Sequence, residues 1–287
     1  MPVLEKIVIS DFRNIRLQEI EFSPNINCIS GNNGEGKTNL IDSIYYMSMT
    51  KSAFASSDKY ILRHGAEEFA LAGTYAMENG TRSRFSMKMT SKGEKKVRRD
   101  DKPYPKVSDH VGALPVVMVS PSDISLVSDS GDERRRFVNS VLSQMDHEYM
   151  TALQQYNRLL LQRNRMLKEM NVDRTLLEVI DMRMSYLAGP IYEARRRFVD
   201  DLKPVVAEYY NISPNELSSK VRTSKIAMAR HIAMYLCRTL LTSSLSQIGN
   251  EFGGRDHSTV IHSVDKIDKE IKTATKITCY EKDYQIK

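Results

Sequence analysis

The sequence has 287 residues, of which 41% are apolar and 27% are charged, and its net charge is +6. This balance is ordinary for a globular protein with one large or two medium domains, and no apolar run approaches the ~20 residues of a membrane span. Glu5 and Asp11 stand where an export signal needs apolar residues, and Cys28, Cys237 and Cys279 match no metal or disulfide spacing. We therefore expect a cytoplasmic protein, whose basic charge permits nucleic-acid binding without requiring it.

The first 131 residues combine strand patterns with one helix. Apolar alternation predicts strands on both sides of the turn Asp11-Phe12-Arg13-Asn14. A short apolar strand is predicted at Ile26–Ile29, directly before a glycine-rich turn. A helix is predicted over 37–50, a meander of short strands over 60–105, and another apolar strand over Leu114–Val119.

Helical patterns dominate the rest of the chain. Residues 132–203 are rich in Leu, Met, Arg and Gln and predict long helices, with a break near Gly189-Pro190. The character changes near Lys203-Pro204 to short helices separated by Ser, Pro and Gly-Gly. We therefore expect an α/β lobe over 1–131, a helical lobe over 132–203, a further domain over 204–272, and a tail without readable pattern over 273–287.

Gly31-Asn32-Asn33-Gly34-Glu35-Gly36-Lys37-Thr38 fits the phosphate-loop pattern G-x-x-x-x-G-K-[ST] in full, between a predicted strand and a predicted helix. Glycines let backbone N–H groups approach phosphate oxygens, and the helix N-terminus adds the positive end of its dipole. Lys37 would reach the β- and γ-phosphates, and the Thr38 hydroxyl would bind Mg²⁺. The alternative is a glycine-rich turn with an incidental lysine, which this context disfavours.

Residues 1 to about 203 resemble the RecF family of recombination-repair ATPases. The segments that carry the resemblance are ISDFRNI, GNNGEGKTNLIDSIY, LPVVMVSPSD and ERRRFVNSVLSQMD, with the helical stretch after it. The resemblance implies an α/β P-loop domain similar to the heads of ABC and structural-maintenance ATPases, with a helical arm. It also implies a homodimer through the ATPase-like region, with ATP between two heads and duplex DNA alongside. The implied ligands are ATP or ADP with Mg²⁺ on Thr38, and the implied nucleotide-binding residues are Asn33, Gly34, Gly36, Lys37, Thr38 and Asn39.

The family pattern is incomplete in this sequence. Residues 120–287 contain neither an LSxGQ-type signature nor an apolar strand ending in the acidic pair of a Walker B motif. Those elements grip the partner's γ-phosphate and orient the attacking water, so their absence argues against ATP hydrolysis, and we assign no catalytic residue. The strands that would flank the P-loop strand in a parallel sheet belong to the same missing portion.

The C-terminal pattern is typical of a helix-turn-helix. Apolar residues between Ile226 and Leu240 recur at helical spacing, and Ser244 with Gln247 forms a capping box for a second helix. Gly253-Gly254 then allows a tight turn before a third helix that begins near Asp256 or His257. A plain three-helix bundle needs the same apolar pattern and stays open on periodicity alone.

The exposed residues favour a DNA-binding module, because Arg255 to Thr259 cluster at the start of the third helix, where recognition helices reach base edges. An acid-free basic stretch from Lys220 to Arg230 precedes the long helix and would serve phosphates or the minor groove. Residues 205–272, and GGRDHSTV above all, resemble the DNA-binding domain of the bacterial replication initiator DnaA. The DNA-binding residues that this resemblance implies are Arg222, Lys225, Arg255, Asp256, His257, Ser258 and Thr259.

Two halves that resemble different families meet near Pro204, so we interpret the chain as a hybrid. The leading hypothesis is a nucleoid-associated protein that recognises duplex DnaA-type boxes beside an ATP-binding region. One alternative is an ATP-dependent DNA-binding protein of recombination repair. Another is a non-functional hybrid whose N-terminal half does not fold.

Overall fold

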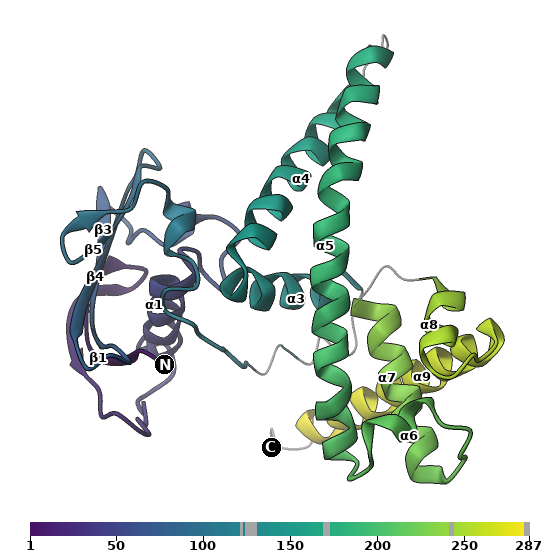
Figure 1. Cartoon of the computed structure of the whole chain (residues 1–287). Coiled ribbons are helices and arrows are strands. Elements are labelled where there is room, and N and C mark those ends of the chain that lie inside the picture. The colour runs from purple at the N-terminus through teal and green to yellow at the C-terminus, as the bar shows by residue number, and fades with distance from the viewer. Residues whose placement is uncertain (121–122, 124–130, 169–172, 241–243, 284–287) are drawn as a thin grey trace. The chain divides into compact units, whose positions relative to one another are not determined.

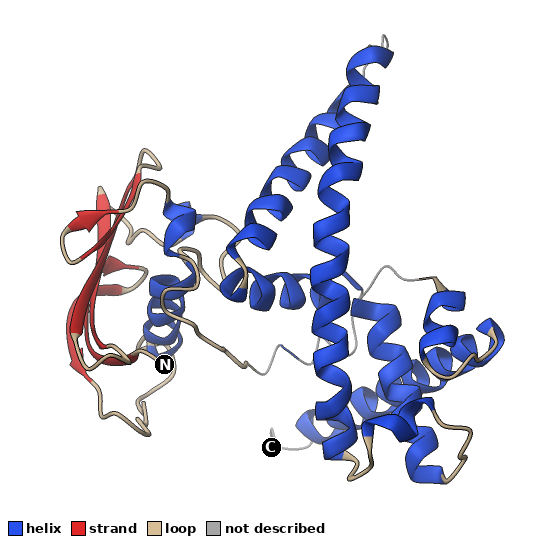
Figure 2. Cartoon of the chain, in the orientation of Figure 1, coloured by secondary structure: helices blue, strands red, loops and turns tan. Residues whose placement is uncertain are grey.

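A computed structural model describes residues 1–120, 123, 131–168, 173–240 and 244–283. The chain forms two compact units, Met1–Met118 and Val119–Lys287. All strands of the described residues lie in the first unit, while the second is helical (Figure 2). This confirms an α/β region followed by an all-α region.

The first unit is built on a six-stranded antiparallel sheet with the order β2-β1-β3-β4-β5-β6. Helix α1 lies against one face of this sheet (Figure 1). The predicted meander over 60–105 is confirmed as four successively paired strands, β3 to β6, and the predicted helix at 37–50 is confirmed as α1. The elements are β1 Val3–Phe12, β2 Ile15–Glu21, α1 Lys37–Met49, η1 Asp58–Tyr60, β3 Glu68–Ala76, β4 Arg82–Thr90, β5 Lys95–Arg99, β6 Lys102–Pro103 and η2 Val107–His110.

The core of the first unit fills the space between α1 and the inner face of the sheet. Alternate residues of each strand point inward, and the ring of Tyr46 on α1 packs edge-to-face on Phe12 and Phe69, with centroids 5.9 and 5.3 Å apart. Such aromatic pairs contribute roughly 0.5–1.5 kcal/mol each beyond the area they bury. This packing holds α1, the helix that follows the phosphate loop, against β1 and β3.

Two predicted strands are wrong in the structure. Ile26–Ile29 and Leu114–Val119 have no ladder partner, and Ile26 and Val117 are 91% and 82% exposed. A strand needs a neighbouring strand to pair with, and within the described residues neither segment takes part in a ladder. Leu114 is buried in the core of the first unit, whereas Ile26, Val117 and Val119 are exposed, so the apolar composition predicted more burial than these segments have.

The second unit consists of packed helices. Helices α4 and α5 lie side by side as an antiparallel arm (Figure 1), and Asp146 and Asp173 cap their N-termini through side-chain oxygens. The elements are α3 Gly131–Met145, α4 His147–Met166, α5 Arg174–Tyr209, α6 Pro214–Ser218, α7 Ser224–Leu240, α8 Leu245–Glu251 and α9 His257–Asp283.

Helix α5 is continuous where the sequence predicted a break. Pro190 and Pro204 both lie inside it. Each proline removes one backbone donor, but Ile191 and Ala194 are buried in the core, which holds the helix together across that point. The predicted domain boundary at 203/204 falls within this helix and stays a prediction.

One apolar core joins the arm to the helices that follow it. Val199 and Ala207 of α5 share this core with Ala233 of α7, Phe252 and Val260. Helix α9 continues to Asp283, so much of the stretch predicted to lack a pattern after Thr273 is helical. Residues 284–287 of the predicted tail, and 124–130 beside the predicted 131/132 lobe limit, lie outside the described residues.

Candidate nucleotide loop and nucleic-acid interface

The phosphate loop has the backbone conformation that its glycines allow. Gly34 and Gly36 have φ of 86° and 103°, in the left-handed region that side chains disfavour. Gly36 is the N-cap of α1, and no side chain caps this helix. Its first-turn N–H groups are therefore available to an anion at the positive end of the helix dipole. A nucleotide phosphate fits this loop.

Charged side chains of the loop bond to the loop itself. The Lys37 ammonium donates to the carbonyls of Gly31 and Asn32 at 2.6 and 2.7 Å. The Glu35 carboxylate accepts from the backbone N–H and the side-chain amide of Asn32 at 2.8 and 2.9 Å. These bonds from Asn32 lower the pKa of Glu35. The ionised Glu35 carboxylate therefore occupies the Asn32 N–H of the loop itself.

Asn14 in the β1–β2 turn bridges the loop to α1. Its side-chain amide donates to the Gly34 carbonyl at 3.2 Å, and its side-chain oxygen accepts from Asn39 at 2.6 Å. A Cβ on Gly36 would lie 2.9 Å from that same oxygen, and the φ of 103° at this position favours glycine. The sequence motif containing Asn14 predicted only a turn, because nothing local indicates a partner 20 or 25 residues away.

A buried ion pair holds the same turn. Asp42 of α1 is completely buried and lies 3.0 Å from the Arg13 guanidinium. It also accepts from the Ser52 hydroxyl and the Ala53 N–H. Arg13 has a φ of 52°, uncommon for a residue with a side chain. The network stabilises this strained conformation beside the phosphate loop.

The C-terminal helices have the geometry that the sequence predicted. Ser244 accepts from the Gln247 N–H while the Gln247 side chain accepts from the Ser244 N–H, which confirms the capping box. The turn after α8 contains Gly253 and Gly254, both with positive φ. A Cβ on Gly253 would lie 2.2 Å from the Ser218 carbonyl oxygen, so the turn packs too closely for any side chain.

The start of α9 presents polar side chains to solvent. The side chains of Asp256 and His257 are 64% and 61% exposed, and Ser258 is also exposed. Asp256 accepts from the Ser258 N–H at 2.8 Å, and these bonds lower its pKa, so it stays ionised. Thr259 is half-buried at the edge of this surface. Four of the five residues expected at the major groove therefore share one surface at the helix N-terminus.

Arg255 differs from those four, because its guanidinium donates to the Ser219 carbonyl at 2.7 Å. The buried Arg230 donates to the same carbonyl and to those of Glu216, Leu217 and Val221. The two arginines thus fix the loop that carries the exposed Arg222. Sequence reasoning treated Arg230 as one more cation of a basic stretch and missed this role.

Two histidines lie beside these arginines in a hollow of about 420 Å³ between α7 and α9. Ser263 donates its hydroxyl proton to the Thr259 carbonyl, so the His231 Nδ1 must donate to Ser263, at 2.8 Å. Burial, with Lys266 and His262 nearby, lowers the pKa of His231. The lining residues are Arg222, Ala227, Arg230, His231, Arg255, Ser258, Thr259, His262 and Ser263.

Family models match both parts of the chain. The AAA domain model matches residues 6–204, and the model of the bacterial dnaA protein helix-turn-helix matches residues 199–267. The first match covers more than half of the 287 residues. The chain therefore belongs to the AAA domain family and carries a dnaA-type helix-turn-helix after it.

Curated relatives extend the first match. The chain is 41% identical over 208 residues to the DNA replication and repair protein RecF of Parabacteroides distasonis, covering 72% of this chain and 57% of the relative. It is 38% identical over 231 residues to that of Porphyromonas gingivalis, covering 80% and 62%. The predicted resemblances are confirmed, and the chain spans less than two thirds of these relatives.

Solved structures confirm the fold. The recombination mediator protein RecF-ATP of the RecFOR pathway is 23% identical, with a TM-score of 0.69 over 94% of this chain and 81% of that protein. A second structure, titled RecF-ATPrS, has a TM-score of 0.70 at 21% identity, with the same coverage. Within the described residues, no helix has the length and apolar character to span a membrane.

Proposed function

We propose that this chain binds duplex DNA of the DnaA-box type through residues 204–272, with α9 in the major groove and Arg222 in the minor groove. The observation that carries the proposal is the cluster of exposed Asp256, His257 and Ser258 at the start of α9, behind a complete helix-turn-helix. Asp256 and His257 supply an acceptor and a donor to base edges, and the Thr259 methyl is suited to a thymine methyl. We place such a protein in the cytoplasm, at the nucleoid.

The roles of the surrounding cations follow from their contacts. Arg222 stands on a loop whose carbonyls are held by Arg230 and Arg255, so its position is preset rather than acquired on binding. Lys225 is exposed and donates only weakly, to the Asn211 carbonyl at 3.3 Å, so it is available for phosphates. We assign Arg255 a supporting role at the groove through the Ser219 carbonyl.

Three variants test this assignment. His257→Ala and Arg222→Ala should weaken binding to the specific duplex, the former by about 1–3 kcal/mol. Lys225→Ala should weaken binding to all duplexes about equally and lower the salt dependence of binding, because the Lys225 ammonium that it removes would neutralise a phosphate. Fluorescence anisotropy on specific and scrambled duplexes over a salt series measures both effects. Equal, sequence-independent losses in all three variants would refute the base-reading role.

We also propose that the loop binds ATP or ADP. The residues that would hold the phosphates are Asn33, Gly34, Gly36, Lys37, Thr38 and Asn39. The Thr38 hydroxyl would also bind Mg²⁺. The support is the uncapped N-terminus of α1 and the glycine conformations before it. Lys37 would exchange its two carbonyl partners for phosphate oxygens. Lys37→Ala should abolish binding of a fluorescent ATP analogue, whereas Lys59→Ala, an exposed lysine outside the loop, should not.

A second candidate function is that of an ATP-dependent DNA-binding protein of recombination repair, acting as a homodimer through the ATPase-like region. The 41% identity to a RecF protein over 208 residues favours it. Residues 120–287 contain neither the signature nor a Walker B motif, which argues against ATP hydrolysis. Turnover that disappears in Lys37→Ala would place this candidate ahead of the first.

A further inference from the structure

The hollow between α7 and α9 contains two histidines, and we call it the histidine hollow. The rings of His231 on α7 and His262 on α9 lie with their centroids 6.0 Å apart. Ser258 and Thr259, which belong to the surface proposed to contact DNA, line the same hollow, and so does Arg222. Because about half or more of the hydrogen bonds to DNA go to its backbone, a duplex on this surface would bring phosphates close to these rings.

Hydrogen bonds fix the tautomer of His231. Ser263 is completely buried and donates its hydroxyl proton to the Thr259 carbonyl at 2.7 Å, so its oxygen is left as an acceptor. The His231 Nδ1 lies 2.8 Å from that oxygen and therefore carries the ring proton. Within the described part of the chain, Nε2 accepts no hydrogen bond. It is the atom at which the neutral ring can take up a second proton.

The surroundings of the His231 ring are mostly cationic. The charged or titratable groups that face it come from α7, α9 and the segments before them, namely Arg230, His262, Lys266, Glu270, Arg222 and Arg255. Glu270 is the one acid among these groups. Burial, and next the neighbouring Lys266 and His262, lowers the pKa of His231 below its ordinary value of 6.5. The ring is therefore neutral near pH 7 as long as no anion lies beside it.

We propose that duplex binding on this surface is coupled to the uptake of one proton by His231, so that pH regulates the affinity for DNA. This inference rests on the proposed DNA-binding function and adds a regulation to it. A phosphate at the histidine hollow places a negative charge near the ring, and an opposite charge within about 4–6 Å favours the charged form of a side chain. A proton from solvent then binds Nε2, which donates to a phosphate oxygen, while Nδ1 keeps its bond to Ser263.

Linkage gives the direction and the size of the effect. The bound protein holds more protons than the free protein, so the association constant rises as the pH falls. An opposite charge at that distance strengthens proton binding about tenfold. About threefold of this gain should appear in the Kd for duplex DNA between about pH 8 and 6, and the rest at lower pH.

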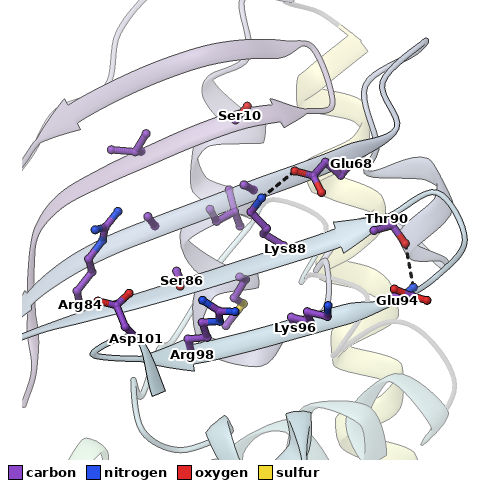
Figure 3. A pocket seen from close by; sticks show the side chains of 15 residues that line it. Ser10, Glu68, Arg84, Ser86, Lys88, Thr90, Glu94, Lys96, Arg98 and Asp101 are labelled. Carbon is purple, nitrogen blue, oxygen red and sulfur yellow. Dashed lines mark hydrogen bonds and ion pairs between the residues drawn. The ribbon is translucent and has the colours of Figure 1, made fainter. Parts of the chain in front are cut away.

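The other hollow of the described residues does not produce this dependence. It lies on the face of the sheet opposite to α1 and is lined by cations and carboxylates, among them Arg84, Lys88 and Glu68 (Figure 3), but by no histidine. Histidine is the side chain whose ordinary pKa lies within this range of pH. His257 is exposed at the start of α9, and it stays unchanged in every variant of the test, so its contribution is common to all.

The test measures binding of the full chain to a duplex with a DnaA-type box and to a scrambled duplex, between about pH 6 and 8. Fluorescence anisotropy at constant salt gives Kd, and isothermal titration calorimetry in two buffers of different ionisation enthalpy counts the protons taken up. The test variant is His231→Gln, whose amide can bond to Ser263 but takes up no proton. The matched control is His147→Gln, at an exposed histidine of α4 outside the histidine hollow. Circular dichroism confirms that each variant folds over this range.

The parent chain and His147→Gln should bind about threefold more tightly at pH 6 than at pH 8, with a net proton uptake that is smaller in His231→Gln. His262→Gln removes a group that opposes the charge on His231, so it should move the pH dependence to higher pH. Equal proton uptake and equal pH dependence in the parent chain and His231→Gln would overturn the coupling, even where the chain still prefers the box. Absence of duplex binding at every pH would overturn the DNA-binding function together with the coupling.

Discussion

At the residue scale, the phosphate loop depends on buried polar groups outside its own motif. Asp42 is fully buried and has three partners, the Arg13 guanidinium, the Ser52 hydroxyl and the Ala53 N–H. The Arg13 Nε is also buried, and it has no hydrogen-bond partner among the residues that the structure describes. The turn that carries Asn14 therefore depends on one carboxylate of α1.

Replacing that carboxylate should be costly. Asp42→Asn leaves the Arg13 charge uncompensated in a buried site, and we expect a loss of about 3 kcal/mol in the free energy of unfolding. Glu19→Gln, which breaks the more exposed pair with Lys6, should cost less than about 1 kcal/mol. Urea unfolding followed by tyrosine fluorescence measures both. Equal losses would show that the buried pair has no special role.

We expect His110 to make the stability of the first unit depend on pH. Its ring is buried, and Nε2 donates to the Met47 carbonyl at 2.7 Å, while Nδ1 has no partner among the described residues. Burial lowers its pKa below the ordinary value of 6.5. A proton on Nδ1 would therefore have no acceptor in the folded state.

The sign of this effect follows from linkage. Below about pH 6.5 the unfolded chain takes up the proton and the folded chain resists it, so acid favours unfolding. We expect the melting temperature to fall between pH 7.5 and 5.5, and to fall less in His110→Gln. His64→Gln, at an exposed histidine, should leave the pH dependence unchanged. An identical pH dependence in all three proteins would contradict this assignment.

At the element scale, the helix-turn-helix depends on a close backbone contact at Gly249, which a side chain at that position would prevent. A Cβ on Gly249 of α8 would lie 2.0 Å from the Arg255 carbonyl oxygen, next to the start of α9. Gly249→Ala should therefore displace α9 and cost at least about 2 kcal/mol, within the range for overpacked sites. Binding to the specific duplex should fall with it.

Gly189→Ala is the matched control for that change. Gly189 lies inside α5 with no atom within 4 Å of its added Cβ. Alanine is favoured over glycine in a helix by about 1 kcal/mol, so this variant should be as stable as the parent chain or more stable. The melting temperatures of both variants, compared with that of the parent chain, test this difference in stability. A Gly249→Ala protein with unchanged stability and binding would argue against close packing of α8 on α9.

Short sequence patterns predicted the structural elements that depend on residues close together in the sequence. The capping box at Ser244, the glycine turn and the start of α9 depend on residues within a few positions of each other, and all were predicted. The strand at Ile26–Ile29 was not correct, because a strand depends on a neighbour elsewhere in the chain. The contacts of Asn14 and Arg230 were missed for the same reason, since their partners are 9 to 25 residues away.

At the scale of the whole molecule, regions that match two different family models follow each other within one chain. The matches to the AAA domain and to the dnaA helix-turn-helix overlap only between residues 199 and 204, within α5. The apolar core continues from α5 into α7 and α9. The arm and the helix-turn-helix therefore form one compact unit, although they resemble different families.

The central claim is that the C-terminal module recognises a specific duplex. The measurement that tests it most directly is fluorescence anisotropy of the full chain on a duplex with a DnaA-type box and on a scrambled duplex, in near-physiological salt. We predict a preference of about a thousandfold for the box, typical of specific DNA-binding proteins. Equal, salt-sensitive binding to both duplexes would contradict the claim and favour the repair-type function.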